Sequence, residues 1–353
     1  MHKQRGRQGI DALTVVGYRL GPTPGQKGAH RTQKEAQAAL TELLASIDGG
    51  TFVAPSKLTV ARYLDAWLDG RAAAGLRPST VAGYRQRVEG YVVPRIGAVP
   101  LQGLSALDLD RLYASLASEK LSLSTIRGVH AVVSKALADA ERKGLVACNA
   151  ARLATPPKSS ATRPPEMTVW TPVELASFLG MVQGHHYGPL MRTAAMTGLR
   201  RSEVCGLRWA DVDLGAATLT VRQAVQLVGG RIVVGAVKTA RSRRRVDLDA
   251  GTVAMLRAHR RTQASERLIV GAGWRDRDLV FTAPEGSPLN PDTVTQWFDR
   301  TVRRSSLPRI RLHDLRHTHA THLLAAGVNV KIVSERLGHA STSFTSRLTS
   351  TPI

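Results

Sequence analysis

The chain has 353 residues, which predicts roughly two or three domains, and its hydrophobic content of 43% is ample for buried cores. Lysine and arginine number 49 against 27 acidic residues, a formal net charge of +22 that favours a polyanionic partner. No apolar run is long enough to span a membrane, no apolar signal region follows the basic start, and the two cysteines form no disulfide framework, so we expect a cytoplasmic protein.

The basic residues are spread through sequence that looks folded, whereas a membrane-surface protein more often carries one basic amphipathic helix. This layout favours nucleic acid as the partner. A generically basic protein without such a partner is the remaining explanation.

The first part of the chain, 1–50, is expected to be a small strand-plus-helix module. A short apolar stretch at 13–16 precedes a turn region rich in glycine and proline at 21–28. Strong helix formers follow at 35–44 and end before Gly49.

The second part, 56–154, is predicted to be all helix. Val60, Leu64 and Trp67 recur at the spacing of one helical face. The following helices are expected to begin at the capping residues Ser79, Ser105 and Ser124.

Arg85 and Arg87 lie on the predicted polar face of the second helix and are either solvated charges or DNA contacts. A stretch rich in proline, serine and basic residues at 155–165 has no periodicity, which is typical of a linker between domains.

The third part, 166–353, mixes helices with short strands. Thr171 and Glu174 have the spacing of a capping box, and Gly229-Gly230 predicts a hairpin turn. Strands are expected at 217–222, 231–237 and 244–248, and helices at 187–196, 251–267, after Asn290, at 313–326 and before Gly338. The fold class predicted for the whole chain is α+β, mainly α with small β-sheets.

Two arginine-containing motifs could bind phosphate. Arg200 follows a glycine turn, and Glu203 lies one helical step further, where a carboxylate can hold the guanidinium fork in place. His313 and Arg316 share one face of a predicted helix.

Two further candidates come from loops. Lys238 begins the basic run 238–245 between two strands, with Arg243 as a candidate DNA contact, and His339 follows a helix stop. Taken alone, each motif could simply be a set of charged side chains exposed to solvent. A zinc site at His313 and His317 is the weaker alternative, because no glutamate lies between them and no cysteine assists.

Taken together and in this order, the motifs resemble those of the tyrosine recombinases, the phage integrases and their relatives. The resemblance implies a helical core-binding domain, a catalytic domain at 166–353 and a small arm-binding module at the start. It implies that Arg200 and Arg316 clamp the scissile phosphate, that His313 and His339 complete the pocket, and that Lys238 protonates the leaving oxygen. Glu203 would support the site from behind, and neither metal nor cofactor would be needed. We also expect both arginines to face the surface and to contribute little to stability.

The sequence departs from the family pattern where the nucleophilic tyrosine should lie, near Leu348 or Thr349. All six tyrosines precede Arg200, and the tail after Thr345 resembles no family ending, as a frameshift or truncation would produce. The segment that normally follows the tyrosine and packs on a neighbouring protomer is also missing.

The sequence therefore predicts a site-specific recombinase that binds duplex DNA at attachment-type sites but does not cut it. Self-association on DNA is expected, weakened by the missing segment. A non-catalytic regulator that occupies recombination sites is the alternative. A metal-dependent nuclease is disfavoured because no cluster of carboxylates is present.

Overall fold

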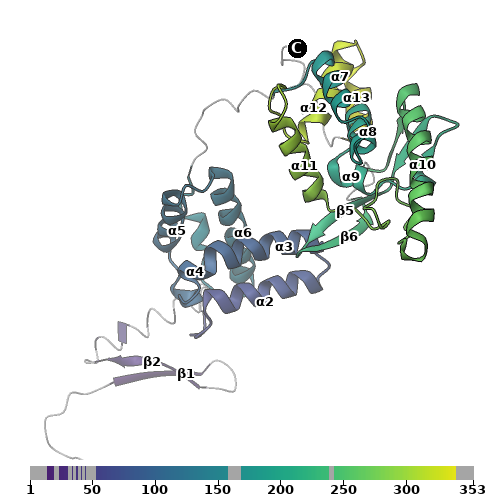
Figure 1. The fold of residues 1–353 in the computed structure, drawn as a ribbon. Helices are drawn as coiled ribbons and strands as arrows, with labels where there is room; N and C mark the ends of the chain where they lie inside the picture. The colour runs from purple at the N-terminus through teal and green to yellow at the C-terminus, as the bar shows by residue number, and fades with distance from the viewer. Residues whose placement is uncertain are drawn as a thin grey trace, which may run out of the picture. The chain divides into compact units, whose positions relative to one another are not determined.

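The computed structural model describes residues 14–19, 24–30, 53–157, 168–237 and 242–338, with a few helical positions between 34 and 44. The chain divides into two compact units, Met1–Ser160 and Ala161–Ile353 (Figure 1). Within the described ranges, no helix is both long and apolar enough to cross a membrane.

The first unit begins with an antiparallel hairpin of β1 (Thr14–Arg19) and β2 (Pro24–His30). The prediction of a turn over 21–28 was therefore wrong in its second half, because residues from Pro24 onward belong to a strand. Glycine is a weak strand former by itself, but pairing with the β1 backbone fixes its conformation here.

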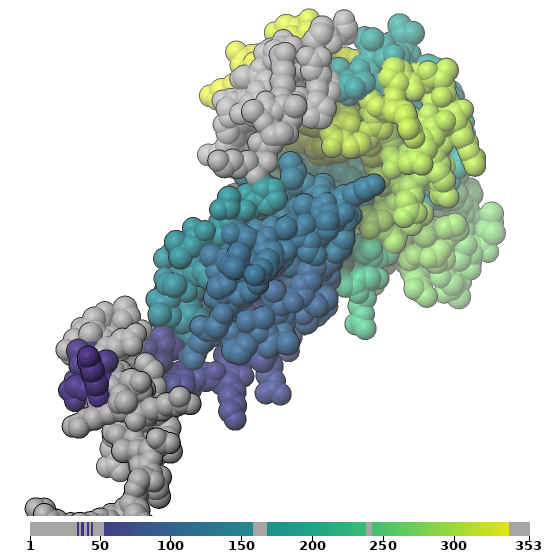
Figure 2. All heavy atoms as spheres, turned by 90° about the vertical axis from the view of Figure 1, so that its left-hand side faces the viewer, coloured from purple at the N-terminus to yellow at the C-terminus, as the bar shows by residue number. Residues whose placement is uncertain are grey.

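Between residues 56 and 154 the first unit is helical, as predicted. Its α-helices are α2 (Val60–Ala73), α3 (Pro78–Arg87), α4 (Val93–Ile96), α5 (Ala106–Ser118) and α6 (Leu123–Arg142), with single turns of other helix types at Val88–Val92, Leu101–Gly103 and Ala150–Arg152. Their apolar faces form one core. On the face shown in Figure 2, the atoms of this helical part lie together, in purple, blue and teal.

Helix capping in this unit follows the sequence only in part. Ser105 and Asp108 form the predicted capping box at the start of α5. Ser79 and Ser124 do not cap their helices, because α3 starts with Pro78 at its first turn and α6 is capped by Ser122. Both helices begin earlier than predicted, which shows that a serine inside the first turn cannot be told from the cap by residue type alone.

The second unit contains the helices α7 (Pro172–Met181), α8 (Gly188–Thr197), α9 (Arg201–Cys205), α10 (Ala250–Val270), α11 (Pro291–Arg303), α12 (Asp314–Ala325) and α13 (Val330–Leu337). Thr171 and Glu174 form the predicted capping box of α7. The rings of Trp170, Phe178 and Phe298 pack together at the centre of its core.

Small antiparallel sheets complete this unit. One has the strand order β3 (Val212–Asp213), β4 (Thr218–Val221), β7 (Arg244–Asp247), and the other pairs β5 (Gln223–Val228) with β6 (Arg231–Ala236). The hairpin turn at Gly229-Gly230 is confirmed, and both glycines have positive φ angles. Its first strand is β5, which the sequence analysis missed. The predicted class, mainly α with small β-sheets, is thus confirmed.

Candidate functional site

The site begins at the end of α8, where Gly198 adopts a left-handed conformation with φ 65°. A β-carbon here would lie 2.5 Å from Leu337 Cδ2 and 2.9 Å from His319 Cδ2, so any other residue would have to displace these two side chains. The tight turn directs the chain into α9 and puts Arg200 at its start.

Glu203 holds Arg200 from a nearly inaccessible position, with 4% of its side chain exposed. Its carboxylate accepts a hydrogen bond from the Arg200 backbone at 2.9 Å and another from Arg200 Nη1 at 2.7 Å. Burial alone would raise the pKa of Glu203, but ion pairs with Arg244 and Arg200 hold it below its usual range. The carboxylate is therefore ionised and fixes the guanidinium, as the sequence analysis expected.

Arg244, on β7, is a member of the site that the sequence analysis missed. Its side chain is 6% exposed and contacts both oxygens of Glu203, with Nη1 at 3.2 Å and Nη2 at 2.8 Å. A signal was available in the alternation of the strand, because Arg244 is in phase with the apolar residues Val246 and Leu248.

Arg316 lies on α12 and is 2% exposed. Its Nη1 donates to the Gly198 carbonyl at 2.6 Å and its Nη2 to the Leu337 carbonyl. Burial and the nearby positive charges of Arg200 and Arg244 lower the pKa of Arg316 to about 9, so it remains charged at neutral pH. The expectation that this arginine faces the surface was wrong.

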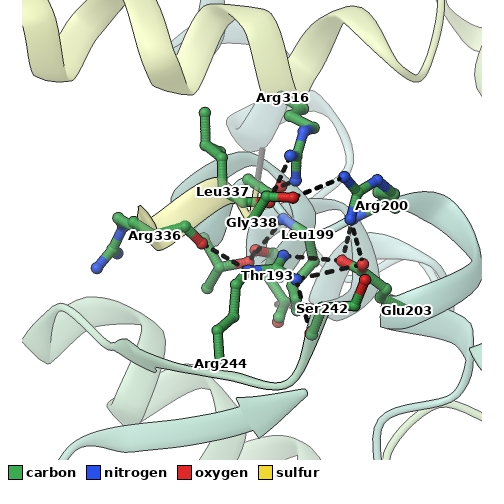
Figure 3. A network of polar contacts seen from close by, with 12 residues as sticks. Thr193, Leu199, Arg200, Glu203, Ser242, Arg244, Arg316, Arg336, Leu337 and Gly338 are labelled. Atoms are coloured by element: carbon green, nitrogen blue, oxygen red, sulfur yellow. Dashed lines mark hydrogen bonds and ion pairs between the residues drawn. The ribbon is translucent and has the colours of Figure 1, made fainter. Parts of the chain in front are cut away.

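Three arginines converge on the end of α13. The carbonyl groups of residues 336, 337 and 338 accept hydrogen bonds, in chain order, from Arg244, Arg316 and Arg200 (Figure 3). Carbonyl groups at a helix C-terminus lack partners within the helix and carry partial negative charge. The arginines therefore satisfy this helix end and draw it to the site.

His313 immediately precedes α12 and its ring contacts that of His317 edge-to-face at a centroid distance of 5.1 Å. Although His313 reaches the surface, protein packed around its ring withholds water and, with the charges of His317 and Arg316, lowers its pKa to about 4. At neutral pH it is an uncharged imidazole that can exchange hydrogen bonds.

The other histidines of α12 have structural partners. His319 accepts a hydrogen bond from Arg336 Nε at 3.1 Å, and His322 contacts the Trp170 carbonyl at 2.8 Å. In the part of the chain that the structure describes, no group of three or more histidine, cysteine or acidic side chains could hold a metal ion.

Several candidates lie outside the described residues, namely Lys238, His339, Leu348 and Thr349. In the sequence, His339 directly follows Gly338, which closes α13 in a left-handed conformation.

The three candidate DNA contacts have different surroundings. Arg85 is paired with the carboxylates of Asp65, Asp69 and Glu89. Arg87 donates to the Gly83 carbonyl at 2.8 Å. Arg243 is exposed and lines a hollow with Arg208 and Arg222. Of the three, Arg243 has surroundings most like those of a phosphate contact.

The chain is similar to known proteins over most of its length. The phage integrase family matches residues 181–351, the segment that contains Arg200, Arg244 and Arg316. An integrase from Streptomyces ambofaciens is 30% identical over 330 residues, covering 91% of this chain and 83% of the relative. The chain belongs to the phage integrase family. A XerC-like tyrosine recombinase from Caldanaerobacter subterraneus subsp. tengcongensis is 26% identical over 334 residues, covering 90% of this chain and 85% of the relative.

Solved structures show the same fold for this integrase-family chain. The Tn1549 transposon integrase in complex with transposon right end DNA has a TM-score of 0.69 and 20% identity, covering 84% of this chain and 96% of that one. A lambda integrase tetramer bound to a Holliday junction has a TM-score of 0.60 and 19% identity, covering 97% and 96%.

Proposed function

We propose that this chain is a site-specific recombinase by descent, which binds duplex DNA and grips one backbone phosphate between Arg200 and Arg316. The observation that carries the proposal is the convergence of these arginines, from segments more than a hundred residues apart, on neighbouring carbonyls of Leu337 and Gly338. Similarity to integrases whose structures contain DNA supports duplex DNA as the partner.

The charge balance of the site suits an oxyanion. Arg200 and Arg244 pair with the carboxylate of Glu203, and Arg316 adds a third positive charge nearby, so these four side chains carry two more positive charges than negative ones. Attack on a phosphodiester increases the negative charge on its non-bridging oxygens. Fixed arginines stabilise such charge because they need no reorganisation during the reaction.

The remaining roles follow the family pattern. We propose Lys238 as the general acid for the leaving oxygen and His339 as a second hydrogen-bonding group on the phosphate. His313, a neutral imidazole in the unbound chain because its pKa is lowered to about 4, would contribute a hydrogen bond to the phosphate.

The chain is further proposed to bind without cutting. No tyrosine follows Tyr187, and Leu348 and Thr349 occupy the region where the family has its nucleophile. The threonine hydroxyl stands on a much shorter stem than a tyrosine hydroxyl, so it would not reach a phosphate held for tyrosine, and positioning supplies much of the rate of such a reaction. A regulator that occupies recombination sites without chemistry is the second candidate, favoured by the same observation.

The domain arrangement also remains a proposal, with an arm-type module at 1–50, a core-type domain at 56–154, a linker at 155–165 and the catalytic-type domain at 166–353. Arg243 is proposed to contact DNA from the last of these. Arg85 and Arg87 are weaker candidates because Arg85 is already paired with three carboxylates and Arg87 with a backbone carbonyl. We propose that copies of the chain associate on DNA.

The test begins with selection of bound sites from a random duplex library, which should yield an inverted repeat. A nicked version of the selected site then traps any covalent intermediate, which is resolved on a denaturing gel. We expect the unmodified chain to bind the selected site and to form no covalent adduct. The matched variants Leu348→Tyr and Thr349→Tyr, which place a tyrosine where the family has its nucleophile, are assayed for the adduct in parallel. An adduct from the unmodified chain contradicts the loss of cleavage, and failure to select any site contradicts the recombinase assignment.

A further inference from the structure

We infer that Arg244 is a positioning residue of the phosphate site, which sets Arg200 through Glu203 and sets the end of α13 through the carbonyl of Arg336. The inference rests on the proposed function, because it assigns Arg244 a part in phosphate binding by the same site. Nothing in its contacts requires Arg244 to touch the phosphate itself.

Arg200 and Arg244 share one carboxylate, that of Glu203. Glu203 Oε1 accepts from Arg200 Nη1 at 2.7 Å and from Arg244 Nη1 at 3.2 Å, while Oε2 accepts from the Arg200 backbone and from Arg244 Nη2. Arg244 thus fixes both oxygens of the carboxylate that orients Arg200. The side chain of Arg200 is 35% exposed, so Glu203 provides much of its constraint.

Arg244 also contacts the end of α13 through its Nε. Its Nε donates to the Arg336 carbonyl at 2.6 Å, in the last turn of α13 (Figure 3). The next two carbonyls of that segment bind Arg316 and Arg200. One side chain therefore connects the carboxylate behind the phosphate site with the helix end from which His339 follows.

A lysine at position 244 could not make the same set of contacts. A guanidinium presents its donors in a planar fork and can serve two carboxylate oxygens and a carbonyl at once, whereas an ammonium acts as a point charge. Arg244 uses all three of its nitrogens in this way. The geometry therefore depends on arginine and not merely on positive charge.

A purely structural role is the competing explanation, since a buried ion pair can hold a fold without affecting a ligand. The two explanations differ in what lysine does. If Arg244 only neutralises Glu203, Arg244→Lys should keep both the stability and the oxyanion affinity that Arg244→Met loses. If Arg244 positions Arg200 and α13, Arg244→Lys should keep the stability but bind the oxyanion as weakly as Arg244→Met.

The experiment measures binding of inorganic sulfate to the full chain by calorimetry and counts only the binding that Arg200→Ala abolishes. We expect Arg244→Lys and Arg244→Met to weaken this binding by about tenfold, as expected for neighbours in one ion-pair network. Arg245→Met is the matched control, because Arg245 is the exposed neighbour on the same strand and should leave affinity unchanged. Melting temperature is recorded for every variant.

Because Arg244→Met leaves a buried carboxylate with one partner fewer, the double variant Glu203→Gln with Arg244→Met covers the case in which it fails to fold. Relative to Glu203→Gln alone, it should weaken sulfate binding by less than the tenfold expected of Arg244→Met, since the route from Arg244 to Arg200 through Glu203 is already lost and only the contact with the Arg336 carbonyl remains. An Arg244→Lys variant with unmodified affinity, or strictly additive losses in the double variant, overturns the inference. Sulfate binding that Arg200→Ala leaves intact instead overturns the proposed phosphate site, and with it this inference.

Discussion

Arg200 and Gly338, separated by 138 positions in the sequence, are joined by a hydrogen bond of 3.2 Å from Arg200 Nη2 to the glycine carbonyl. The same guanidinium binds Glu203 through Nη1. One of the donors suited to a phosphate is therefore occupied by the end of α13 in the unbound chain. We expect phosphate binding and the position of this helix end to be coupled, because both use the same N–H groups.

Arg316→Ala should destabilise the protein far more than Arg200→Ala. Loss of Arg316 leaves two buried carbonyls, of Gly198 and Leu337, without this partner, at a cost of about 1–3 kcal/mol each. Loss of Arg200 should cost less, because its side chain is 35% exposed and Arg244 still pairs with Glu203. Urea unfolding of both variants measures the difference, and equal losses would show that Arg316 is not the anchor of this helix end.

Gly198→Ala should lower stability by more than the strain of a left-handed alanine, because its β-carbon would collide with Leu337 and His319. Gly327→Ala is the matched control, since Gly327 has φ +80° and no atom within 4 Å of an added β-carbon. The control should lose about 1–2 kcal/mol from backbone strain alone. Thermal unfolding of the two variants provides the comparison, and similar melting temperatures would contradict close packing of α13 on this turn.

Acidification should destabilise the fold through His319. Burial, followed by the charge of Arg336, lowers its pKa from 6.5 to about 3, so the unfolded chain binds the proton more tightly. The stabilising effect of the neutral ring is complete above pH 6.5 and is lost progressively as the pH falls towards 3. The slope attributable to one such group is at most about 1.4 kcal/mol per pH unit.

His319→Gln keeps an acceptor for Arg336 without a group that titrates in this range. The free energy of unfolding of this variant should depend less steeply on pH between 6.5 and 4 than that of the unmodified chain. Urea titrations of both proteins at several pH values measure this difference in pH dependence. Parallel pH profiles would mean that His319 has the same pKa in the folded and the unfolded chain.

Duplex DNA binding should weaken steeply with salt. A net charge of +22 and the site excess of positive charge predict many phosphate contacts, and log K falls by about 0.9 for each phosphate neutralised as log salt rises. Fluorescence anisotropy over a salt series measures the slope. Arg243→Ala should reduce the slope by about one contact, whereas Arg85→Ala should change it little. If the affinity hardly changed with salt, the net positive charge would no longer support DNA as the partner.

Much of the architecture could be read locally. The capping boxes at Ser105 and Thr171 and the turn at Gly229-Gly230 depend on residues a few positions apart, and the structure contains all three. Ser79 and Ser124 are not the predicted caps, because each lies just inside a helix that starts earlier. Strand β5 was missed because its pairing with β6, and not its own pattern, makes it a strand.

The sequence by itself determined which residues could bind a phosphate, because Arg200 with Glu203 and His313 with Arg316 are each set by one turn of helix. Only the tertiary structure decided that Arg316 is buried, that Arg244 completes the pair with Glu203, and that three arginines bind successive carbonyls at the end of α13. These contacts join residues from distant segments. Their geometry depends on strand register and on how α12 and α13 pack, which spacing along the chain does not specify.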